Sequence, residues 1–460
     1  MKRTSITLCI SAAYMFLLTC PVVRNWAIGQ STEIQSVAAD LGSLPPAKFV
    51  NPIGEGADPW VVWDEENERY LWCLSEGNRA ISIWKSKSLS SLGSKQVVWT
   101  APDSGLYSRE VWAPELHQID GRWYIYFAAS DGKNENHKTF VLESEDSDPF
   151  GKYRLHGPLR TGDGEDRDSP NVWAIDMTVL EHDQQRFAIW SGWDAPGTDQ
   201  QFLYIAKMKS PFELEGKRVQ ICSNEDFLWE RIQPDLNKRG LNEGPQILKH
   251  AGRTFVLFSC GASWMDTYKL GMLELVGTNP LATEAWKKHD EPVFQRAENV
   301  YGVGHSCFVP SPDKQELWHV YHAKRDKRPG WRRAIYIQPI RFSESGWPQF
   351  APPEGGVAIE RPSGETSTEL ELPLELFAKN SAPDATWSYF GHHQYVAEAN
   401  HTLELGRIPD APINEYRCGE KVVLDGFLRG NYRAKIDIDF HGDTQSRDAG
   451  ILFRCSGASV

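Results

Sequence analysis

The stretch Asn242-Glu-Gly-Pro-Gln246 places a carboxylate, Glu243, at the opening of the apolar pair Ile247-Leu248. A turn-like Lys249-His-Ala-Gly252 follows, and the chain continues as Arg253-Thr-Phe-Val-Leu-Phe-Ser259. That second run is rich in β-branched and aromatic residues, and two such runs around a short turn are typical of a β-hairpin. The stretch therefore predicts a hairpin with an acidic residue at the start of its first strand.

The same layout, an opening residue followed by a hairpin pattern, occurs five times along the chain. The residues that open the five units are Asp58, Trp112, Asp176, Glu243 and His305. They are separated by 54, 64, 67 and 62 positions, a period typical of β-propeller blades that each hold several short strands. Five units predict five blades. Because blades surround one axis, we expect the five opening residues to meet near one end of the central channel.

Length and composition limit the class of protein. A chain of 460 residues is long enough for two domains, and its 40% hydrophobic content supports a sizeable core. The net charge of −13 and the lack of a basic run argue against a nucleic acid or an anionic membrane surface as a partner. The 18 tryptophans suit stacking on the C–H faces of sugars, although filling the blade cores is the alternative for any one of them.

The N-terminus has the pattern of an export signal. Met1-Lys-Arg3 is followed by an apolar run from Ile6 to Leu18, which is too short for a transmembrane helix. We expect a signal peptide over residues 1–28, a loose lead-in over residues 29–48, and a secreted or periplasmic protein without membrane association once the signal is removed. Leu17-Leu-Thr-Cys20 is a poorer match to a lipoprotein cleavage box, because threonine is unsuited to that position.

Two domains are expected after the lead-in. The propeller should occupy residues 49–361, with a short helical turn near Ala282-Thr-Glu-Ala-Trp286. Further on, Asn431–Phe440 alternates as a half-buried strand does, and Gly450–Cys455 reads as another strand. Residues 369–460 therefore predict a partial β-sandwich that resembles the first part of concanavalin-like jelly-roll domains, with sugar binding or spacing as its role. Its open edges indicate that this sandwich is incomplete.

Six cysteines lie outside the signal region: Cys73, Cys222, Cys260, Cys307, Cys418 and Cys455. Export permits disulfides, and the sequence does not choose among their pairings. Cys73, Cys260 and Cys307 fall in apolar strand patterns, where a buried free thiol is the alternative. No CxxC motif or Cys/His cluster predicts a zinc site.

Three carboxylates, a histidine and aromatic residues around one pocket suit the hydrolysis of a glycosidic bond with inversion. That reaction needs a protonated acid for the leaving oxygen and an ionised carboxylate that activates water. A third carboxylate beside the acid raises the pKa of the acid by like-charge repulsion and keeps it protonated near neutral pH. The alternative use of clustered acids is to bind Ca²⁺ or Mg²⁺.

Seven short motifs follow one another in a recognisable order. They are Asp58-Pro59, Trp112-Ala-Pro-Glu115, Ile175-Asp176, Glu243-Gly-Pro245, Gly304-His305, Tyr321-His-Ala323 and Gln338-Pro339. No single motif is specific, but in their order, spacing and coincidence with the repeat the chain resembles glycoside hydrolase family 43 over roughly residues 51–342. The resemblance implies an all-β fold with a five-bladed β-propeller and the activity of a glycosidase.

The resemblance also implies roles for individual residues. Asp58 would be the general base, Glu243 the general acid, and Asp176 the residue that tunes the pKa of the acid and orients it. His305 would lie in the central channel and hold a calcium ion or a water cluster. Ser306 follows that histidine where many relatives carry Asn or Gly, so the calcium ion is a structural option and no cofactor is expected to be required.

Each assignment has a plainer alternative. Asp58 precedes a proline and suits a turn, Asp176 lies in an apolar run and suits a structural hydrogen bond, and His305 suits a satisfied core position. Trp112 is expected either to form a platform for a sugar or to pack in the core. Glu115 is expected to be structural.

Arg332 and Arg333 are both candidates to contact a substrate hydroxyl. Adjacent residues on a strand point in opposite directions, so at most one of them faces the site. The sequence assigns the role to neither.

The common activities of the family are α-L-arabinofuranosidase, β-xylosidase and endo-arabinanase. The stretches Cys260-Gly-Ala-Ser263, Tyr268-Lys-Leu-Gly-Met272 and Glu291-Pro-Val-Phe294 resemble the exo-acting arabinofuranosidases. The sequence therefore predicts a secreted, inverting enzyme that releases terminal α-L-arabinofuranosyl residues, with arabinose- or xylose-containing plant or algal polysaccharide as its partner.

Other activities remain open. One is a β-xylosidase or endo-arabinanase of the same family, and another is a carbohydrate-binding propeller without catalysis, although the five different opening residues favour one asymmetric site. A third is a retaining hydrolase of the invertase kind, whose two carboxyl groups would lie about 5 Å apart, against about 6.5–9.5 Å for inversion.

Overall fold

The computed structural model describes residues 48–161, 171–232 and 239–365, together with the backbone of six further strands near the two ends of the chain. The chain divides into two compact units. One is Val50–Glu365, and the other combines Met1–Phe49 with Thr366–Val460.

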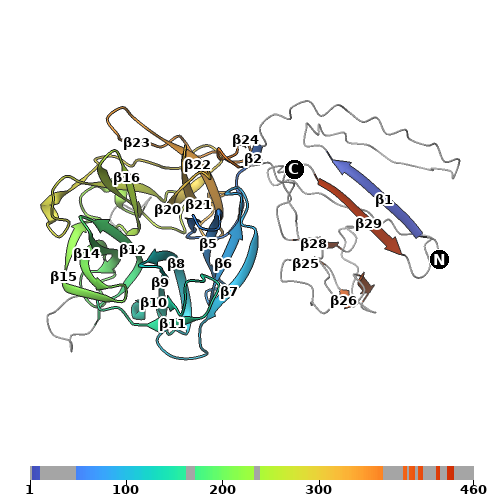
Figure 1. Ribbon diagram of the computed structural model, residues 1–460, viewed down its shortest axis with the longest axis horizontal. Helices are drawn as coiled ribbons and strands as arrows, with labels where there is room; N and C mark the ends of the chain where they lie inside the picture. Colours follow the sequence, from blue (N-terminus) through green and yellow to red (C-terminus); the bar gives the residue numbers. More distant parts are fainter. Residues whose placement is uncertain are drawn as a thin grey trace. The chain divides into compact units, whose positions relative to one another are not determined.

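The larger unit consists of five antiparallel sheets around a common centre (Figure 1). Blade 1 holds β4 (Trp60–Asp64), β5 (Arg69–Glu76), β6 (Ala80–Ser86) and β7 (Ser94–Thr100). Blade 2 holds β8 (Arg109–Ile119), β9 (Arg122–Ser130), β10 (Lys138–Ser144) and β11 (Tyr153–His156). Blade 3 holds β12 (Ala174–His182), β13 (Gln185–Trp193), β14 (Gln201–Ser210) and β15 (Glu213–Cys222).

Blade 4 holds β16 (Asn242–His250), β17 (Arg253–Cys260), β18 (Lys269–Leu275) and β19 (Trp286–Lys288). Blade 5 holds β20 (Tyr301–Pro310), β21 (Leu317–Lys324), β22 (Ala334–Phe342), β23 (Pro348–Gln349) and the added β3 (Gly54–Glu55). Two short strands, β2 (Lys48–Val50) and β24 (Ala358–Glu360), complete this part of the chain. The predicted five-bladed propeller is confirmed, and each predicted hairpin is the first pair of strands of one blade.

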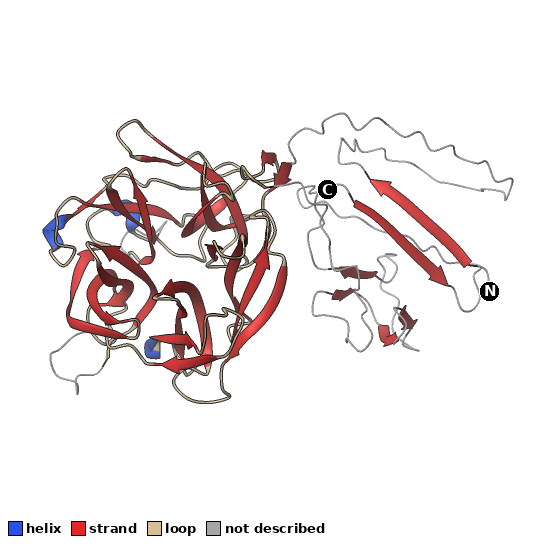
Figure 2. Ribbon diagram, in the orientation of Figure 1, coloured by secondary structure: helices blue, strands red, loops and turns tan. Residues whose placement is uncertain are grey.

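Helix contributes little to the described residues, as Figure 2 shows. Three 3₁₀ turns are present, η1 (Asn134–Asn136), η2 (Leu228–Glu230) and η3 (Thr283–Ala285), and the last falls where the sequence predicts a helical turn. None of the helices in the described part of the chain is long and apolar enough to cross a membrane.

The core of the propeller lies between neighbouring blades, because each sheet packs one face against the next. One cluster joins Leu71 and Ile83 of blade 1 to Ile125 and Phe140 of blade 2, and similar clusters fill the gaps between the later blades. Three of the largest fully buried side chains are Trp72, Trp190 and Trp318. These tryptophans therefore fill blade cores, which is the alternative that the sequence left open for any single Trp.

The cysteines of the propeller are also part of this core. Cys73, Cys222, Cys260 and Cys307 are buried and have free thiols. The free-thiol interpretation is therefore correct for the three cysteines in apolar strand patterns. Cys418 and Cys455 lie outside the residues whose side chains are described.

The ring closes where the segment before blade 1 runs along the outer side of β22. Ile53 N donates to Ile335 O at 2.7 Å, and Gly56 N donates to Arg333 O at 3.2 Å. The Asn51 amide makes two further bonds with the backbone of Ile337, at 2.7 and 3.0 Å. Residues nearly 300 positions apart in sequence thus pair, and the closing segment delivers Asp58 to the end of β22.

A β-bulge interrupts the innermost strand of four blades at equivalent places. The register shifts between Trp112 and Glu115, Ile175 and Thr178, Glu243 and Gln246, and Gly304 and Cys307. Within each bulge one residue has a positive φ: Ala113 (43°), Asp176 (53°), Gly244 (56°) and His305 (50°). Asp58 has the same conformation (φ 50°) just before β4. Such bulges redirect side chains and are frequent beside active sites.

In the smaller unit, β1 (Arg3–Ile10) pairs with β29 (Tyr432–Asp439), β25 (Trp387–Phe390) with β28 (Lys421–Leu424), and β26 (His393–Glu398) with β27 (Thr402–Arg407), all antiparallel. The predicted strand over residues 431–440 coincides with β29. The predicted strand over residues 450–455 and most of the predicted signal peptide lie outside the described residues. The signal peptide and the partial sandwich stay predictions.

Candidate active site

The site residues predicted from the sequence gather at the end of the propeller where the innermost strands begin. Two of them lie one residue away from the position that was predicted to be equivalent in all five blades. Asp58, Asp176 and His305 occupy the equivalent positive-φ position, whereas Trp112 and Glu243 lie one residue before it. The prediction that all five are equivalent is therefore wrong by one residue in two blades. The shift arises because Ala113 and Gly244 take the strained position there, and Gly244 adopts a positive φ without steric cost.

Asp58 is held as an ionised carboxylate. Its side chain is 21% exposed, and Oδ1 accepts a hydrogen bond from Arg333 Nη1 at 3.0 Å. Burial opposes ionisation of this carboxyl, but the charge of Arg333 and the neighbouring His305 and His322 outweigh burial and bring the pKa of Asp58 well below its usual range. This carboxyl is therefore ionised at any physiological pH, which a group that accepts a proton from water must be.

Two buried histidines complete the surroundings of Asp58. His322 Nδ1 lies 3.1 Å from both the backbone nitrogen and Oδ1 of Asp58, and it can serve only one of them at a time. His305 Nδ1 lies 3.4 Å from the same Oδ1. Burial lowers the pKa of His322 to about 4 and lowers that of His305 as well, so burial disfavours the charged form of both rings. Arg333 is therefore the permanent positive charge beside Asp58.

The surroundings of Glu243 raise its pKa, whereas those of Asp58 lower the pKa of that carboxyl. The carboxyl group of Glu243 is buried, Oε1 accepts from the Tyr268 hydroxyl at 2.8 Å, and Oε2 accepts from Gln201 Nε2 at 3.0 Å. Burial raises the pKa of Glu243, and these two hydrogen bonds, which favour the ionised form, reduce the rise. The group is therefore fixed in direction from both sides and keeps a proton to higher pH than an ordinary glutamate.

Asp176 lies beside Glu243. Its Oδ2 accepts from the backbone nitrogen of Gly244 at 3.0 Å, so it contacts the residue that follows the glutamate directly. Burial raises the pKa of Asp176 well above its usual value, and the charges of Glu243 and Asp58 raise it further. Two buried carboxyls that repel each other disfavour the doubly ionised state, so the pair loses its second proton at a higher pH than an isolated carboxyl does.

Two glycines make this crowding feasible. A Cβ on Gly244 would lie 3.1 Å from His305 Nδ1, and the φ of Gly244 is positive. A Cβ on Gly304 would lie 2.2 Å from Cε1 of Tyr268. Glycine at these two positions lets the His305 and Tyr268 rings approach the backbone around Glu243.

A second polar layer lies two residues further along the innermost strands. Glu115 is buried there, accepts from the Gln246 amide, and has its Oε2 3.0 Å from His117 Nε2. Burial raises the pKa of Glu115 well above its usual value, and the charge of Glu115 contributes to the raised pKa of Asp176. Its place beneath the site fits the structural role expected from the sequence.

Trp112 lies in an aromatic wall beside the site. Its ring stacks on that of His137 with centroids 3.9 Å apart and planes at 24°, and it packs against a cluster that includes Ile175, Trp173 and Trp193. Trp173 and Trp193 stack on each other at 5.1 Å. Trp112 is half-buried, so one face of this wall packs and part of the ring remains accessible.

The donors around His305 do not by themselves build a calcium cage. Among the described residues no group of three or more His, Cys, Asp or Glu is placed to hold a metal ion. His305 contributes a nitrogen, with Asp58 as the carboxylate nearest to it, whereas Ca²⁺ takes six to eight oxygen ligands. An ion at this place would have to be bound largely through water.

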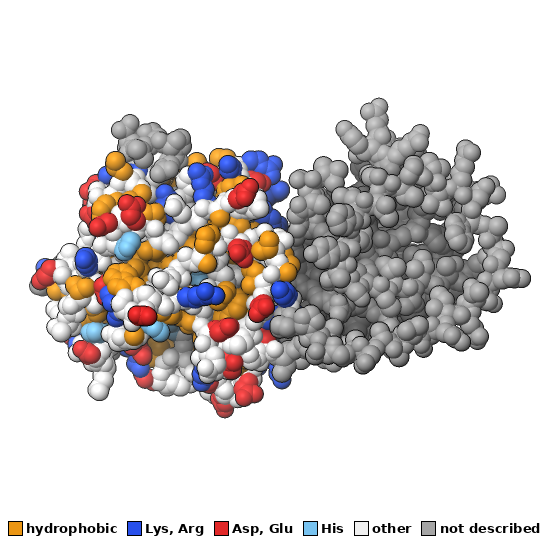
Figure 3. Space-filling view, turned by 90° about the horizontal axis from the view of Figure 1, so that it is seen from above, with side chains coloured by type: hydrophobic (Ala, Val, Ile, Leu, Met, Phe, Trp, Pro, Cys, Tyr) orange, Lys and Arg blue, Asp and Glu red, His pale blue; other side chains and the backbone are white. Residues whose placement is uncertain are grey.

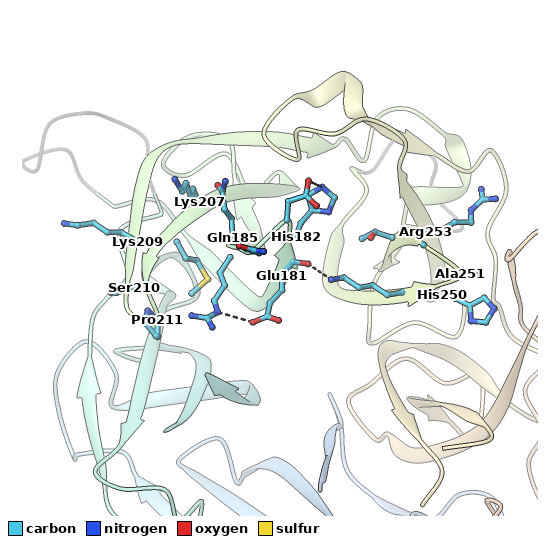
Figure 4. A pocket seen from close by; sticks show the side chains of 17 residues that line it. Glu181, His182, Gln185, Lys207, Lys209, Ser210, Pro211, His250, Ala251 and Arg253 are labelled. Carbon is cyan, nitrogen blue, oxygen red and sulfur yellow. Dashed lines mark hydrogen bonds and ion pairs between the residues drawn. The ribbon is translucent and has the colours of Figure 1, made fainter. Parts of the chain in front are cut away.

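A depression in the propeller surface lies away from these residues. It measures about 1000 Å³ and is lined by the turns that end β12, β14 and β16, including Glu181, Lys207 and His250 (Figure 4). A smaller one of about 340 Å³ contains His117, Thr178 and Gln246. The first lies at the ends of the innermost strands, whereas the second extends along them from Trp60 at the start of β4 to Pro310 at the end of β20. The catalytic candidates line neither.

Sequence reasoning missed several residues of the site. Gln201 opens the third strand of blade 3, and nothing in its local pattern separates it from a surface glutamine. Tyr268 and His322 lie within motifs that the resemblance used, but neither was assigned a role. Arg333 was left undecided against Arg332, and ring closure is what brings Arg333 to Asp58. Covariation of Arg333 with Asp58 among homologous sequences is the signal that could have identified this pair.

Comparison with known proteins agrees with this architecture. The sequence profile of the glycosyl hydrolases family 43 matches residues 49–348. An extracellular exo-α-(1→5)-L-arabinofuranosidase of Streptomyces chartreusis is 31% identical over 310 residues, which cover 65% of this chain and 89% of the relative. The α-L-arabinofuranosidase 43 of Humicola insolens is 28% identical over 352 residues, 74% of this chain and 69% of the relative.

A solved structure agrees as well. An α-L-arabinofuranosidase from Lactobacillus brevis superposes with a TM-score of 0.60 at 28% identity, covering 67% of this chain and 97% of that protein. The profile match spans more than half of the chain and coincides with the five blades. The chain belongs to glycosyl hydrolases family 43 and is a glycosidase.

Proposed function

We propose that this glycosidase releases terminal α-L-arabinofuranosyl residues from plant or algal polysaccharides or oligosaccharides by single displacement. The observation that carries the proposal is the contrast between two carboxyl groups at one end of the channel. Asp58 is ionised beside Arg333, whereas Glu243 is buried, raised in pKa and held by Tyr268 and Gln201. Acid and base are thereby distinguished by their surroundings.

In this mechanism Asp58 accepts a proton from a water molecule whose oxygen attacks the anomeric carbon. The bond between that carbon and the leaving oxygen breaks, and Glu243 gives its proton to the departing oxygen. Asp176 repels the charge that forms on Glu243 and fixes the bulge of β16 through Gly244 N. Solvent then removes the proton from Asp58 and returns one to Glu243.

The choice of sugar rests on the relatives. Those at about 30% identity are named as arabinofuranosidases, and the one from Streptomyces chartreusis is named as extracellular and exo-acting. On the face of the larger unit seen in Figure 3, acidic and basic side chains are interspersed, which suits a neutral polysaccharide. Export by the predicted signal peptide over residues 1–28 is part of the proposal.

We infer that no metal is required for turnover, because the ligands near His305 fit calcium poorly and both proton transfers have protein groups. Dialysis against EDTA is expected to leave kcat/KM within about twofold, since no ion stabilises the charge that develops in the reaction. A loss of activity that Ca²⁺ restores would assign an ion to the site of His305.

The experiment that tests the proposed function compares hydrolysis of methyl and 4-nitrophenyl α-L-arabinofuranosides with that of the β-D-xylopyranosides. Wild type should prefer the arabinosides, and Glu243→Gln should lose at least about 10³-fold in kcat on the methyl glycoside, whose leaving group needs a proton. The loss should be smaller on the nitrophenyl glycoside. A preference for xylosides would replace the substrate, and equal losses on both aglycones would argue against Glu243 as the acid.

A further inference from the structure

Beside Arg333 lies a pair of tryptophans, one exposed and one half-buried, that the mechanism above does not use. Trp331 is 64% exposed, and among the described residues no other tryptophan is exposed to this degree. Its ring packs against the half-buried Trp264 with centroids 5.3 Å apart and planes at 54°. Apolar surface of this size exposed on a loop calls for a partner, because burying a tryptophan is favourable.

Trp331 contacts Arg333, which in turn binds Asp58, the proposed base. The guanidinium carbon of Arg333 lies 5.6 Å from the centre of the Trp331 ring, and Nη1 of the same arginine donates to Asp58 at 3.0 Å. One side chain therefore spans the distance between the exposed indole and the carboxylate that activates water.

The Trp264 side is joined to the acid. Trp264 lies in the loop between β17 and β18, and Tyr268 near the end of that loop donates to Glu243 Oε1 at 2.8 Å. The tyrosine ring also stacks on His322 at 5.7 Å. The aromatic pair is thus linked to both catalytic candidates through Arg333 and through the loop that carries Tyr268.

A buried lysine fixes the two loops to each other. Lys324 is 3% exposed, and Nζ donates to the carbonyls of Trp264 at 2.6 Å, Gly330 at 3.2 Å and Arg328. Gly330 N also donates to Trp264 O at 2.9 Å. These bonds fix the backbone of the two loops that carry the indoles, so less loop ordering is needed when a ligand binds there.

We propose that Trp331 and Trp264 form a stacking platform for the leaving-group sugar, which the scissile bond joins to the terminal arabinofuranosyl residue. This inference rests on the proposed function. In the proposed mechanism the terminal arabinofuranosyl residue lies between Asp58 and Glu243. The leaving-group sugar must then extend past Glu243 toward solvent, and Trp331 with Trp264 offers it an aromatic surface. A flat indole fits the apolar C–H face of a furanose or pyranose, and its N–H edge remains free for a hydroxyl.

The alternative is that Trp331 only shields the Arg333–Asp58 ion pair. The two roles differ in which substrates they affect. A platform acts on substrates that have a sugar as the leaving group, whereas loss of a shield lowers activity on every substrate and changes the pH profile. Binding energy from a remote part of the substrate appears in kcat/KM for the longer substrate alone.

The test measures kcat/KM on α-1,5-arabinobiose and on methyl α-L-arabinofuranoside for wild type, Trp331→Ala and Trp331→Phe. Phe212→Ala is the control, since Phe212 is a 37% exposed aromatic residue in the turn between β14 and β15. Trp331→Ala should lower kcat/KM on the disaccharide about 5- to 10-fold, the size of one aromatic stacking contact, and leave the methyl glycoside within about twofold. Trp331→Phe should restore most of the loss, and Phe212→Ala should change neither substrate.

Equal losses on both substrates, or no loss on either, would overturn the platform. The proposed function fails separately. If wild type cleaves xylobiose and methyl β-D-xyloside in place of the arabinosides, the sugar assignment is wrong, and the same ratio of disaccharide to methyl glycoside then tests the platform. A wild type that shows no preference for any disaccharide over its methyl glycoside has no site for the leaving sugar, and the platform is refuted.

Discussion

Replacing Arg333 by glutamine is expected to shift the acidic limb of the pH–rate profile. Asp58 must be ionised to act as a base, and Arg333 is the fixed charge that keeps it so. At the 3.0 Å separation of Nη1 and Oδ1, Coulomb's law with an effective dielectric constant of about 20 gives about 5.5 kcal/mol, or about 4 pKa units. Because the Asp58 side chain is 21% exposed, water compensates for part of this, and a rise of about 1–3 units is expected.

The sign follows from the direction of the shift. In wild type the low pKa of Asp58 keeps the base ionised at acidic pH, so its activity should persist there. In Arg333→Gln the burial of Asp58 is no longer opposed by a full charge, its pKa rises, and kcat/KM falls as the pH drops through the new value. Near pH 8 the variant should recover toward its own plateau.

The assay is kcat/KM on an aryl arabinofuranoside between pH 3 and 9, which reports ionisation in the free enzyme. Arg332→Gln is the matched control, since Arg332 is the exposed neighbour on the same loop. A uniform loss at all pH values with an unmoved acidic limb would refute the electrostatic reasoning and leave Arg333 as a contact to substrate.

Three further predictions concern the surroundings of the acid. Tyr268→Phe removes a hydrogen bond that favours ionised Glu243, so the basic limb of kcat/KM should move up by about 0.5–1 pKa unit, and a downward shift would contradict this. Asp176→Asn removes a carboxyl whose pKa is raised in the folded state, and such a group lowers the free energy of unfolding at pH values above its unfolded pKa of about 3.9. Urea unfolding should therefore show the variant to be more stable than wild type by at least about 1 kcal/mol at pH 7 but not at pH 3. The kcat of the variant should fall. A less stable variant at pH 7 would count against the raised pKa. Gly304→Ala places a methyl group against the Tyr268 ring and should cost about 1–3 kcal/mol in the free energy of unfolding, and wild-type stability would show that the ring is free to move.

The propeller could be predicted because its signal is repeated. Each hairpin has alternating apolar residues and a turn, and five copies at a similar spacing reinforce one another although any one is ambiguous. The prediction that all five opening residues are equivalent was wrong for Trp112 and Glu243. Trp112 and Glu243 lie one residue before the positive-φ position that Asp176 and His305 occupy in the equivalent bulges, and an offset of one residue leaves no mark in a hydrophobic pattern.

The site was predictable only in part for a related reason. Asp58, Asp176, Glu243 and His305 open repeated units, so their meeting follows from ring geometry. Arg333 and Gln201 reach the site from the third strands of their blades or the loops before them, where sequence spacing carries no information about side-chain direction. Their roles depend on ring closure and on side-chain hydrogen bonds, which are long-range properties of the folded chain.

The stereochemistry of the first product tests the central claim most directly. Inversion by Asp58 and Glu243 predicts that ¹H NMR of wild type acting on an α-L-arabinofuranoside shows β-L-arabinose first, with the α anomer growing only as the sugar mutarotates. If the α anomer appears first, the reaction proceeds with retention through a covalent intermediate. Asp58 would then be a nucleophile, and the assignment of this carboxylate as the base that activates water would be wrong.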